Sequence, residues 1–126
     1  MKDIENKEDV KNLVDTFYGK VQKDELIGPI FIGIIGNNWP AHLEKMYSFW
    51  GSILLDEHSY HGRPFLPHAP LPLQKEHFDR WLTLFHHTLD TLYEGEIADI
   101  AKLRSNNIAR MFLSKIEFIR ENTLRK

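Results

Sequence analysis

The spacing of apolar residues predicts helices along most of the chain. In four segments, apolar residues recur three or four positions apart, which places their side chains on one face of an α-helix. These segments are residues 7–22, a stretch that follows Asn38, residues 74–93 and residues 96–122. Nowhere do apolar and polar residues alternate as in a half-buried strand. The chain of 126 residues is therefore predicted to be one all-α domain.

Each predicted helix has an apolar stripe that should face a common core. The first stripe is Val10, Leu13, Val14, Phe17, Tyr18 and Val21. The second is Leu43, Met46, Tyr47, Phe49, Trp50, Ile53 and Leu54, with His42 on it or at its edge. The third is Phe78, Trp81, Leu82, Phe85, Leu89 and Leu92. The fourth is Ile97, Ile100, Ala101, Ile108, Met111, Phe112, Ile116 and Ile119.

Two connections interrupt the helical pattern. Residues 24–38 contain three glycines, and they predict a turn-rich connection with a single helical turn over residues 29–32. Asn38 suits an N-cap, and Pro40 suits the first turn of the helix that follows. Residues 56–73 contain four prolines, which exclude a long helix. Because apolar residues lie between these prolines, we expect a rigid, irregular connection that packs against the core.

Composition narrows the classes of function. The formal net charge is −2 with histidine neutral, so the chain lacks the basic excess of a nucleic-acid-binding protein. The absence of cysteine excludes disulfides, thiolate metal sites and cysteine nucleophiles. The charged first residues do not resemble a signal peptide, and no apolar run is long enough to span a membrane. We therefore predict a cytoplasmic protein with neither a nucleic-acid partner nor a membrane partner.

Aromatic residues and histidines are the unusual part of the composition. The chain has 8 Phe, 4 Tyr, 3 Trp and 7 His. A well-filled core explains the aromatic rings most simply, and a flat cofactor inside that core is the alternative. His42 and His68 both lie among apolar residues, 26 positions apart, with a helix and a loop between them. A haem needs one neutral imidazole below its iron, but the residues alone do not rank these two histidines.

Four motifs, in this order and spacing, resemble the truncated haemoglobins, and most closely the third of their three groups. They are FYGKVQKDELIGPIF at residues 17–31, the tryptophan and histidine pattern of Trp39, His42, Trp50, Leu54 and Leu55, the pattern of Tyr60, Gly62, Pro64 and His68, and HFDRWLTLF at residues 77–85. The resemblance covers about residues 8–112. It implies a globin fold of two crossed antiparallel helix pairs with a very short proximal helix, and haem b as the cofactor.

The resemblance also implies a role for individual residues. His68 would be the proximal ligand of the iron, and Tyr18, His42 and Trp81 would face the bound ligand on the distal side. Phe31 would wedge against the porphyrin. Further suggestions for the apolar wall are Phe17, Met46, Phe49 and Phe78. Arg63 is either a partner of a haem propionate or a solvated loop residue.

Other histidines offer rival sites. His77 is a second candidate for the proximal ligand, but it lies one helical turn from Trp81 and so on the same face. If Trp81 is distal, His77 can hardly bind iron from below. His58 and His61 have a spacing that zinc sites use, but zinc needs three or four convergent ligands.

A dry pocket with several hydrogen-bond donors should hold dioxygen tightly and release it slowly. The expected ligands are O2, NO, CO or peroxide, and the expected role is nitric oxide detoxification or peroxide activation, served by an unidentified reductase. The alternative is a non-catalytic oxygen reservoir, or a haem-based gas sensor acting with a partner.

Overall fold

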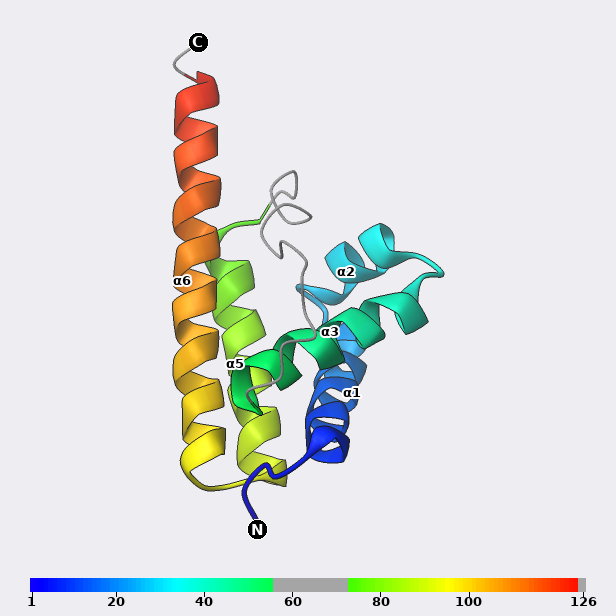
Figure 1. Ribbon diagram of the computed structural model, residues 1–126. Helices are drawn as coiled ribbons and strands as arrows, with labels where there is room; N and C mark the ends of the chain where they lie inside the picture. The colour runs from blue at the N-terminus through cyan, green and yellow to red at the C-terminus, as the bar shows by residue number, and fades with distance from the viewer. Residues whose placement is uncertain (56–72, 125–126) are drawn as a thin grey trace.

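The computed structural model describes residues 1–55 and 73–124 of the chain (Figure 1). Within these residues the chain is helical, with no strand. The helices are α1 (Lys7–Lys23), α2 (Gly28–Ile35), α3 (Trp39–Leu54), α5 (Lys75–Leu92) and α6 (Glu96–Leu124). The predicted all-α class is confirmed. The proline-rich connection predicted over residues 56–73 lies outside the described residues, except for its last residue, Leu73.

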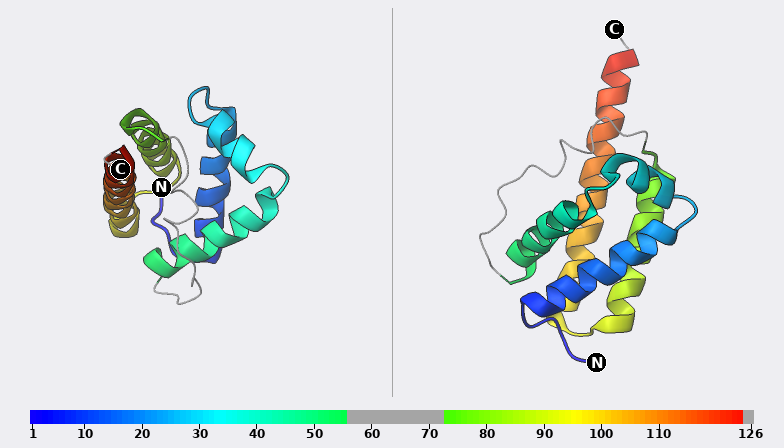
Figure 2. Two further views of the ribbon diagram at one scale, coloured as in Figure 1. Left: turned by 90° about the horizontal axis from the view of Figure 1, so that it is seen from above. Right: turned by 90° about the vertical axis from the view of Figure 1, so that its right-hand side faces the viewer.

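The helices form two antiparallel pairs that cross. α5 and α6 lie side by side and run in opposite directions (Figure 1). α1 and α3 form the other pair, and they also run in opposite directions (Figure 2). α1 packs against α5 as well as against α3, so it joins the two pairs. None of the helices in the described part of the chain combines the length and apolar character needed to cross a membrane.

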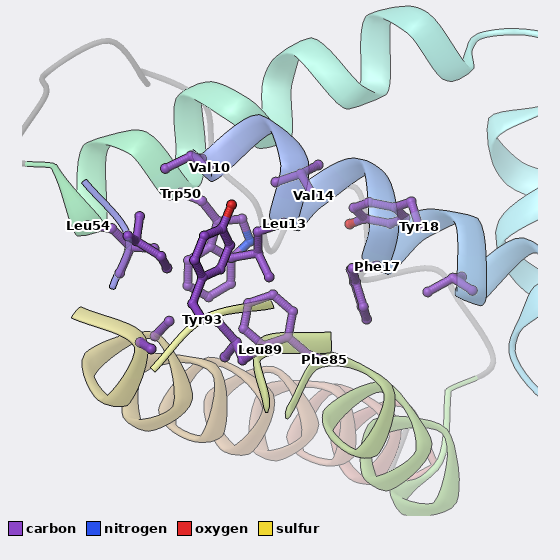
Figure 3. Packing of buried hydrophobic residues seen from close by; sticks show 14 of the residues in the cluster. Val10, Leu13, Val14, Phe17, Tyr18, Trp50, Leu54, Phe85, Leu89 and Tyr93 are labelled. Carbon is purple, nitrogen blue, oxygen red and sulfur yellow. The ribbon is translucent and has the colours of Figure 1, made fainter. Parts of the chain in front are cut away.

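The core forms where α1 meets α5. The predicted stripe of α1 is buried throughout, and Phe17 of α1 and Phe85 of α5 are among the largest fully buried side chains. Figure 3 shows the α1 side chains Leu13 and Phe17 facing Phe85 and Leu89 of α5. Apolar stripes on both helices therefore bury each other, as their spacing predicted.

The short helix α2 is longer than the single turn predicted. Asp24 Oδ2 accepts hydrogen bonds of 3.0 Å from the N–H groups of Leu26 and Ile27, which turns the chain back after α1. Pro29 then occupies the first turn of α2, where a missing N–H costs nothing. Gly36, with a φ of 58°, ends the helix. The sequence pattern did not show this Asp24 contact, which satisfies backbone groups that would otherwise lack partners.

Gly28 lets α2 begin close against the end of α1. A Cβ atom at this position would lie 2.8 Å from the carbonyl oxygen of Val21. No side chain larger than hydrogen fits there without a shift of the backbone. The close approach matters because α2 carries Phe31 toward the interior.

The other helix ends agree with the sequence to within about two residues. Asn6 caps α1 by accepting a hydrogen bond of 3.0 Å from the N–H of Asp9. Asn38 precedes α3 as predicted, but its side chain makes no capping hydrogen bond. α5 starts after Gln74, and Gly95, with a φ of 139°, separates α5 from α6.

Two residues predicted to face inward from α6 are exposed. Met111 is 43% exposed and Ile119 is 42% exposed, whereas Phe112 and Ile116 are buried. Met111 directly precedes Phe112 and is therefore turned about 100° away from it. The last turns of α6 extend past the start of α5 (Figure 1), and Ile119 lies five residues before the end of α6. The apolar stripe of α6 is thus wider and longer than the surface that covers it.

The first five residues form a strap across the turn between α5 and α6. The side chain of Ile4 is buried in the core. Asp3 accepts hydrogen bonds from the N–H groups of Ile97 (2.8 Å) and Ala98 (2.9 Å). These two groups lie in the first turn of α6, where N–H groups have no partner within the helix. The N–H of Glu94 donates to the carbonyl oxygen of Lys2 at 3.0 Å. The strap therefore caps α6 from a distant part of the sequence.

Candidate functional site

A cavity lies between the two helix pairs. It contains about 700 Å³ of space that no atom fills, including the part that opens to solvent. All five helices of the described residues, the turn before α2 and the residue that precedes Gln74 contribute side chains. The described residues that line it are Tyr18, Ile27, Phe31, Met46, Phe49, Trp50, Leu73, His77, Phe78, Trp81, Ile108, Ala109 and Phe112.

The described wall of this cavity is almost entirely apolar. Its polar side-chain groups are the Tyr18 hydroxyl, two indole N–H groups and the His77 imidazole. None of its described residues is an aspartate, glutamate, lysine or arginine. A large flat apolar molecule that needs only a few hydrogen bonds fits such a cavity better than a charged substrate does.

Tyr18 presents a hydroxyl group that stays protonated. Its side chain is 5% exposed, and burial raises the pKa of the hydroxyl far above its ordinary value. No described residue accepts a hydrogen bond from it. The ring is held edge-on by Phe17 at 4.9 Å and by Phe31 at 6.1 Å between ring centroids. Tyr18 is therefore a fixed hydrogen-bond donor.

Trp81, which lines the same cavity, is held by an aromatic cluster. Its ring stacks on Phe85 with a centroid distance of 5.4 Å and an interplanar angle of 2°. Phe17 meets it edge-on at 5.5 Å. These contacts restrict the indole ring, so its N–H is a second donor with a defined position.

His42 lies beside Tyr18 and is not among the residues that line the cavity. Its ring meets Tyr18 edge-on at 5.1 Å and Trp39 edge-on at 5.9 Å between centroids. Its Nε2 atom is buried. This arrangement places His42 where it supports the Tyr18 ring.

His77 lines the same cavity as Trp81, one turn earlier on α5. Its Nδ1 atom accepts a hydrogen bond of 2.8 Å from the backbone N–H of Gln74. Nδ1 thus needs its lone pair for the cap of α5, and in the neutral ring the proton lies on Nε2. An imidazole held this way offers no lone pair to a metal, which counts against His77 as an iron ligand.

A sequence profile described as bacterial-like globin matches residues 2–113. The chain belongs to this family. The protein named Group 3 truncated hemoglobin ctb from Campylobacter jejuni is 38% identical over 111 residues, covering 85% of this chain and 87% of that protein. The Group 2 truncated hemoglobin YjbI from Bacillus subtilis is 30% identical, covering 86% of this chain and 83% of that protein.

The fold supports the same family assignment. The crystal structure of the group III truncated hemoglobin from Campylobacter jejuni superposes with a TM-score of 0.85 at 36% sequence identity, covering 92% of this chain and 95% of that chain. The predicted resemblance to the third group of truncated haemoglobins is confirmed. The cofactor of this globin is haem b, as predicted.

The cavity fits this cofactor. Haem is a flat apolar ring with two carboxylates at one edge, and the described wall is apolar with aromatic rings from α1, α2, α3 and α5. Its few polar groups can contact the carboxylates or a bound ligand. The described residues contain no cluster of three metal-ligating side chains, which a haem iron does not need because the porphyrin supplies four ligands.

The structure of this globin brings together most of the predicted site residues. Those that line the cavity are Tyr18, Phe31, Met46, Phe49, Phe78 and Trp81. Phe17 is buried behind the wall, in contact with both Tyr18 and Trp81. The predicted proximal ligand His68 and the predicted propionate partner Arg63 lie outside the described residues, as do His58 and His61.

Several wall residues were not assigned to the site from the sequence. They are Ile27, Trp50, Leu73, Ile108, Ala109 and Phe112. Trp50 follows Met46 by one turn of α3, so helical spacing could have added it to the wall. The α6 residues gave no such signal, because an apolar stripe does not reveal whether it faces a neighbouring helix or a cavity.

Proposed function

We propose that this globin binds dioxygen or a related small ligand at the haem iron for chemistry on the ligand, and not for oxygen transport. The reactions proposed are nitric oxide detoxification and peroxide activation, with electrons from a reductase. One observation carries the proposal. Two residues with hydrogen-bond donors, Tyr18 and Trp81, line a cavity whose described wall is nearly apolar.

The residues proposed to hold the haem divide by type. His68 would bind the iron on the proximal side, and Arg63 would pair with a propionate. Phe31, Met46, Phe49 and Phe78 would contact the porphyrin as part of the wall, and Phe17 would support them from behind.

Replacing His68 by alanine should remove the five-coordinate signature of the ferrous absorption spectrum. An unchanged spectrum would rule out this ligand.

When bound, haem supplies an iron that takes up a diatomic ligand and makes it partly anionic. Tyr18 and Trp81 line the cavity that would hold this ligand, and their hydroxyl and indole N–H groups would stabilise the negative charge as fixed dipoles do in an oxyanion hole. The apolar wall keeps water away, which strengthens both hydrogen bonds. His42 would act with them, through its contact with the Tyr18 ring.

Two donors favour chemistry over transport. A carrier must release its ligand quickly, and every additional hydrogen bond to the ligand slows release. A polarised oxygen–oxygen bond is easier to cleave or to attack, so the same donors that delay release assist a reaction. Burial raises the pKa of the Tyr18 hydroxyl above its ordinary value, so this group would remain a donor even in alkaline solution.

The test is the oxygen dissociation rate of the Tyr18→Phe and Trp81→Leu double variant. A hydrogen bond contributes about 1–1.5 kcal/mol, so the loss of two should accelerate dissociation about 100-fold. Tyr47→Phe is a matched control, because Tyr47 donates to Asp15 and does not line the cavity. If the double variant released oxygen at the wild-type rate, the assignment of these donors would be wrong.

A turnover measurement distinguishes a catalytic globin from one that only stores its ligand. With a reductase supplied, the wild type should consume nitric oxide or peroxide over many cycles, and the double variant should do so more slowly. Ligand binding without turnover would instead indicate an oxygen reservoir or a gas sensor that acts with a partner.

A further inference from the structure

We infer that His77 positions the haem by donating a hydrogen bond from Nε2 to one of its carboxylates. The inference rests on haem binding, and it does not depend on which ligand chemistry the globin performs. It assigns a role to the remaining titratable side chain of the described wall, since Tyr18 is already used as a donor.

The cap of α5 fixes the orientation of the His77 ring. Nδ1 accepts from the backbone N–H of Gln74 at 2.8 Å, so the ring has its proton on Nε2 and cannot exchange the two roles without breaking the cap. Nε2 lies 4.0 Å from Oε1 of Glu76, which is too far for a hydrogen bond. The Nε2–H group therefore has a defined direction and no hydrogen bond to a described residue.

His77 lies at the edge of the cavity, between its interior and solvent. Its side chain is 13% exposed, and that of its neighbour Glu76 is 67% exposed. Of the other polar wall residues, Tyr18 and Trp50 are 5% and 2% exposed, and Trp81 is half-buried. Because a carboxylate is costly to bury, the haem carboxylates should lie at such an edge and leave the porphyrin inside.

The surroundings of His77 favour an anion. It occupies the first turn of α5, where the partial positive charge of the helix N-terminus attracts negative groups. The described wall has no lysine or arginine that could pair with a carboxylate in its place. The nearby Lys75 is in an ion pair with Asp79 at 2.8 Å. The Glu76 carboxylate is exposed and can turn toward solvent.

A purely structural role of His77, as the cap of α5, is the rival explanation. Two substitutions separate the two roles. His77→Phe removes both the cap and the donor. His77→Glu keeps a side-chain acceptor at the position where glutamate completes a capping box, but it replaces the donor by a negative charge.

The experiment compares haem with haem dimethyl ester, in which the carboxylates are masked. Each form is loaded into the wild type and both variants, and its rate of loss to apomyoglobin is measured. We expect His77→Phe to lose haem about tenfold faster than the wild type, and His77→Glu to lose it faster still. The ester should leave all three proteins at similar rates.

Two outcomes would overturn the inference. If both variants lost haem and its ester with the same acceleration, His77 would act only through the helix cap. If haem loss did not change in His77→Glu, no carboxylate would lie near Nε2. Failure of the wild type to bind haem at all, seen as a missing Soret band, would instead contradict the haem assignment itself.

Discussion

At the scale of single residues, Phe85 supports two tryptophans of the cavity wall. Its ring stacks on Trp81 and on Trp50, the latter at 4.7 Å between centroids, and it meets Phe17 edge-on at 5.1 Å. Phe85 does not line the cavity, and it is fully buried. It therefore supports two wall residues from behind.

Replacing Phe85 by alanine should destabilise the globin by about 3–5 kcal/mol, because the large cavity left behind cannot collapse among three aromatic rings. Urea unfolding of the haem-free chain measures this loss. Leu103→Ala is the control, since Leu103 is 59% exposed on a helix and should change stability by at most about 0.5 kcal/mol. Equal effects of both substitutions would contradict the packing seen around Phe85.

At the scale of helices, α2 shows how one glycine sets the position of a wall element. α2 delivers Phe31 to the cavity, and its first residue, Gly28, touches the backbone at the end of α1. The turn between them is fixed by Asp24, whose second carboxylate oxygen pairs with Arg80 of α5 at 2.7 Å. Helices from both pairs are thus tied together beside the cavity.

Gly28→Ala should destabilise the chain by about 1–3 kcal/mol, because its Cβ would lie 2.8 Å from a carbonyl oxygen that is held within a helix. Gly19→Ala is the matched control. Gly19 lies within α1, where a Cβ would meet no described atom within 4 Å, and alanine there should stabilise the chain by about 0.5–1 kcal/mol. Thermal unfolding should show opposite shifts, and shifts of the same sign would contradict the close approach at Gly28.

The sequence predicted the positions of the helices better than the tertiary contacts around them. The spacing of apolar residues was sufficient for α1 and α5, because each buries one stripe against a neighbour. It underestimated α2, whose start depends on the Asp24 side chain and on tertiary contact. It overestimated the buried face of α6, because spacing does not show where a partner helix ends, as Met111 and Ile119 demonstrate.

The candidate site was predicted mainly through resemblance. Composition and spacing alone did not rank His42 and His68 as haem ligands, and they gave Tyr18 and Trp81 no role beyond the core. The cap at His77 depends on a backbone contact with Gln74, which no sequence pattern revealed. Such roles depend on distances between helices, and the local sequence pattern does not show these distances.

At the scale of the whole molecule, the strap joins the N-terminal residues to the start of α6 through Asp3. Partial burial acts to raise the pKa of this carboxyl group, but hydrogen bonds from the N–H groups of Ile97, Ala98 and Ile4 outweigh it, so the pKa lies below the ordinary value of 3.8. A lowered pKa in the folded state means that ionised Asp3 stabilises the fold. This contribution is present above pH 3.8 and is lost as the pH falls through the lowered pKa.

Asp3→Ala should therefore cost about 1–2 kcal/mol at pH 7, as the loss of a helix cap does, and the difference from the wild type should shrink below pH 4. Urea unfolding at pH 7 and pH 3 measures both values. Asp15→Ala serves as a control, because Asp15 lies on the exposed face of α1 and accepts a hydrogen bond from the Tyr47 hydroxyl instead of capping a helix. A penalty for Asp3→Ala that stayed constant between the two pH values would show that the carboxylate charge is not what stabilises α6.

The strap also has a consequence for the order of events during protein synthesis. Asp3 and Ile97 are 94 residues apart. At about 5–20 residues per second, the ribosome makes the partner of Asp3 roughly 5–20 s after Asp3 itself. During that interval Asp3 lacks the N–H groups that it binds in the finished fold. The fold therefore cannot close from its first residues onward, and the strap is set in place only after α5 has been made and α6 has begun to emerge.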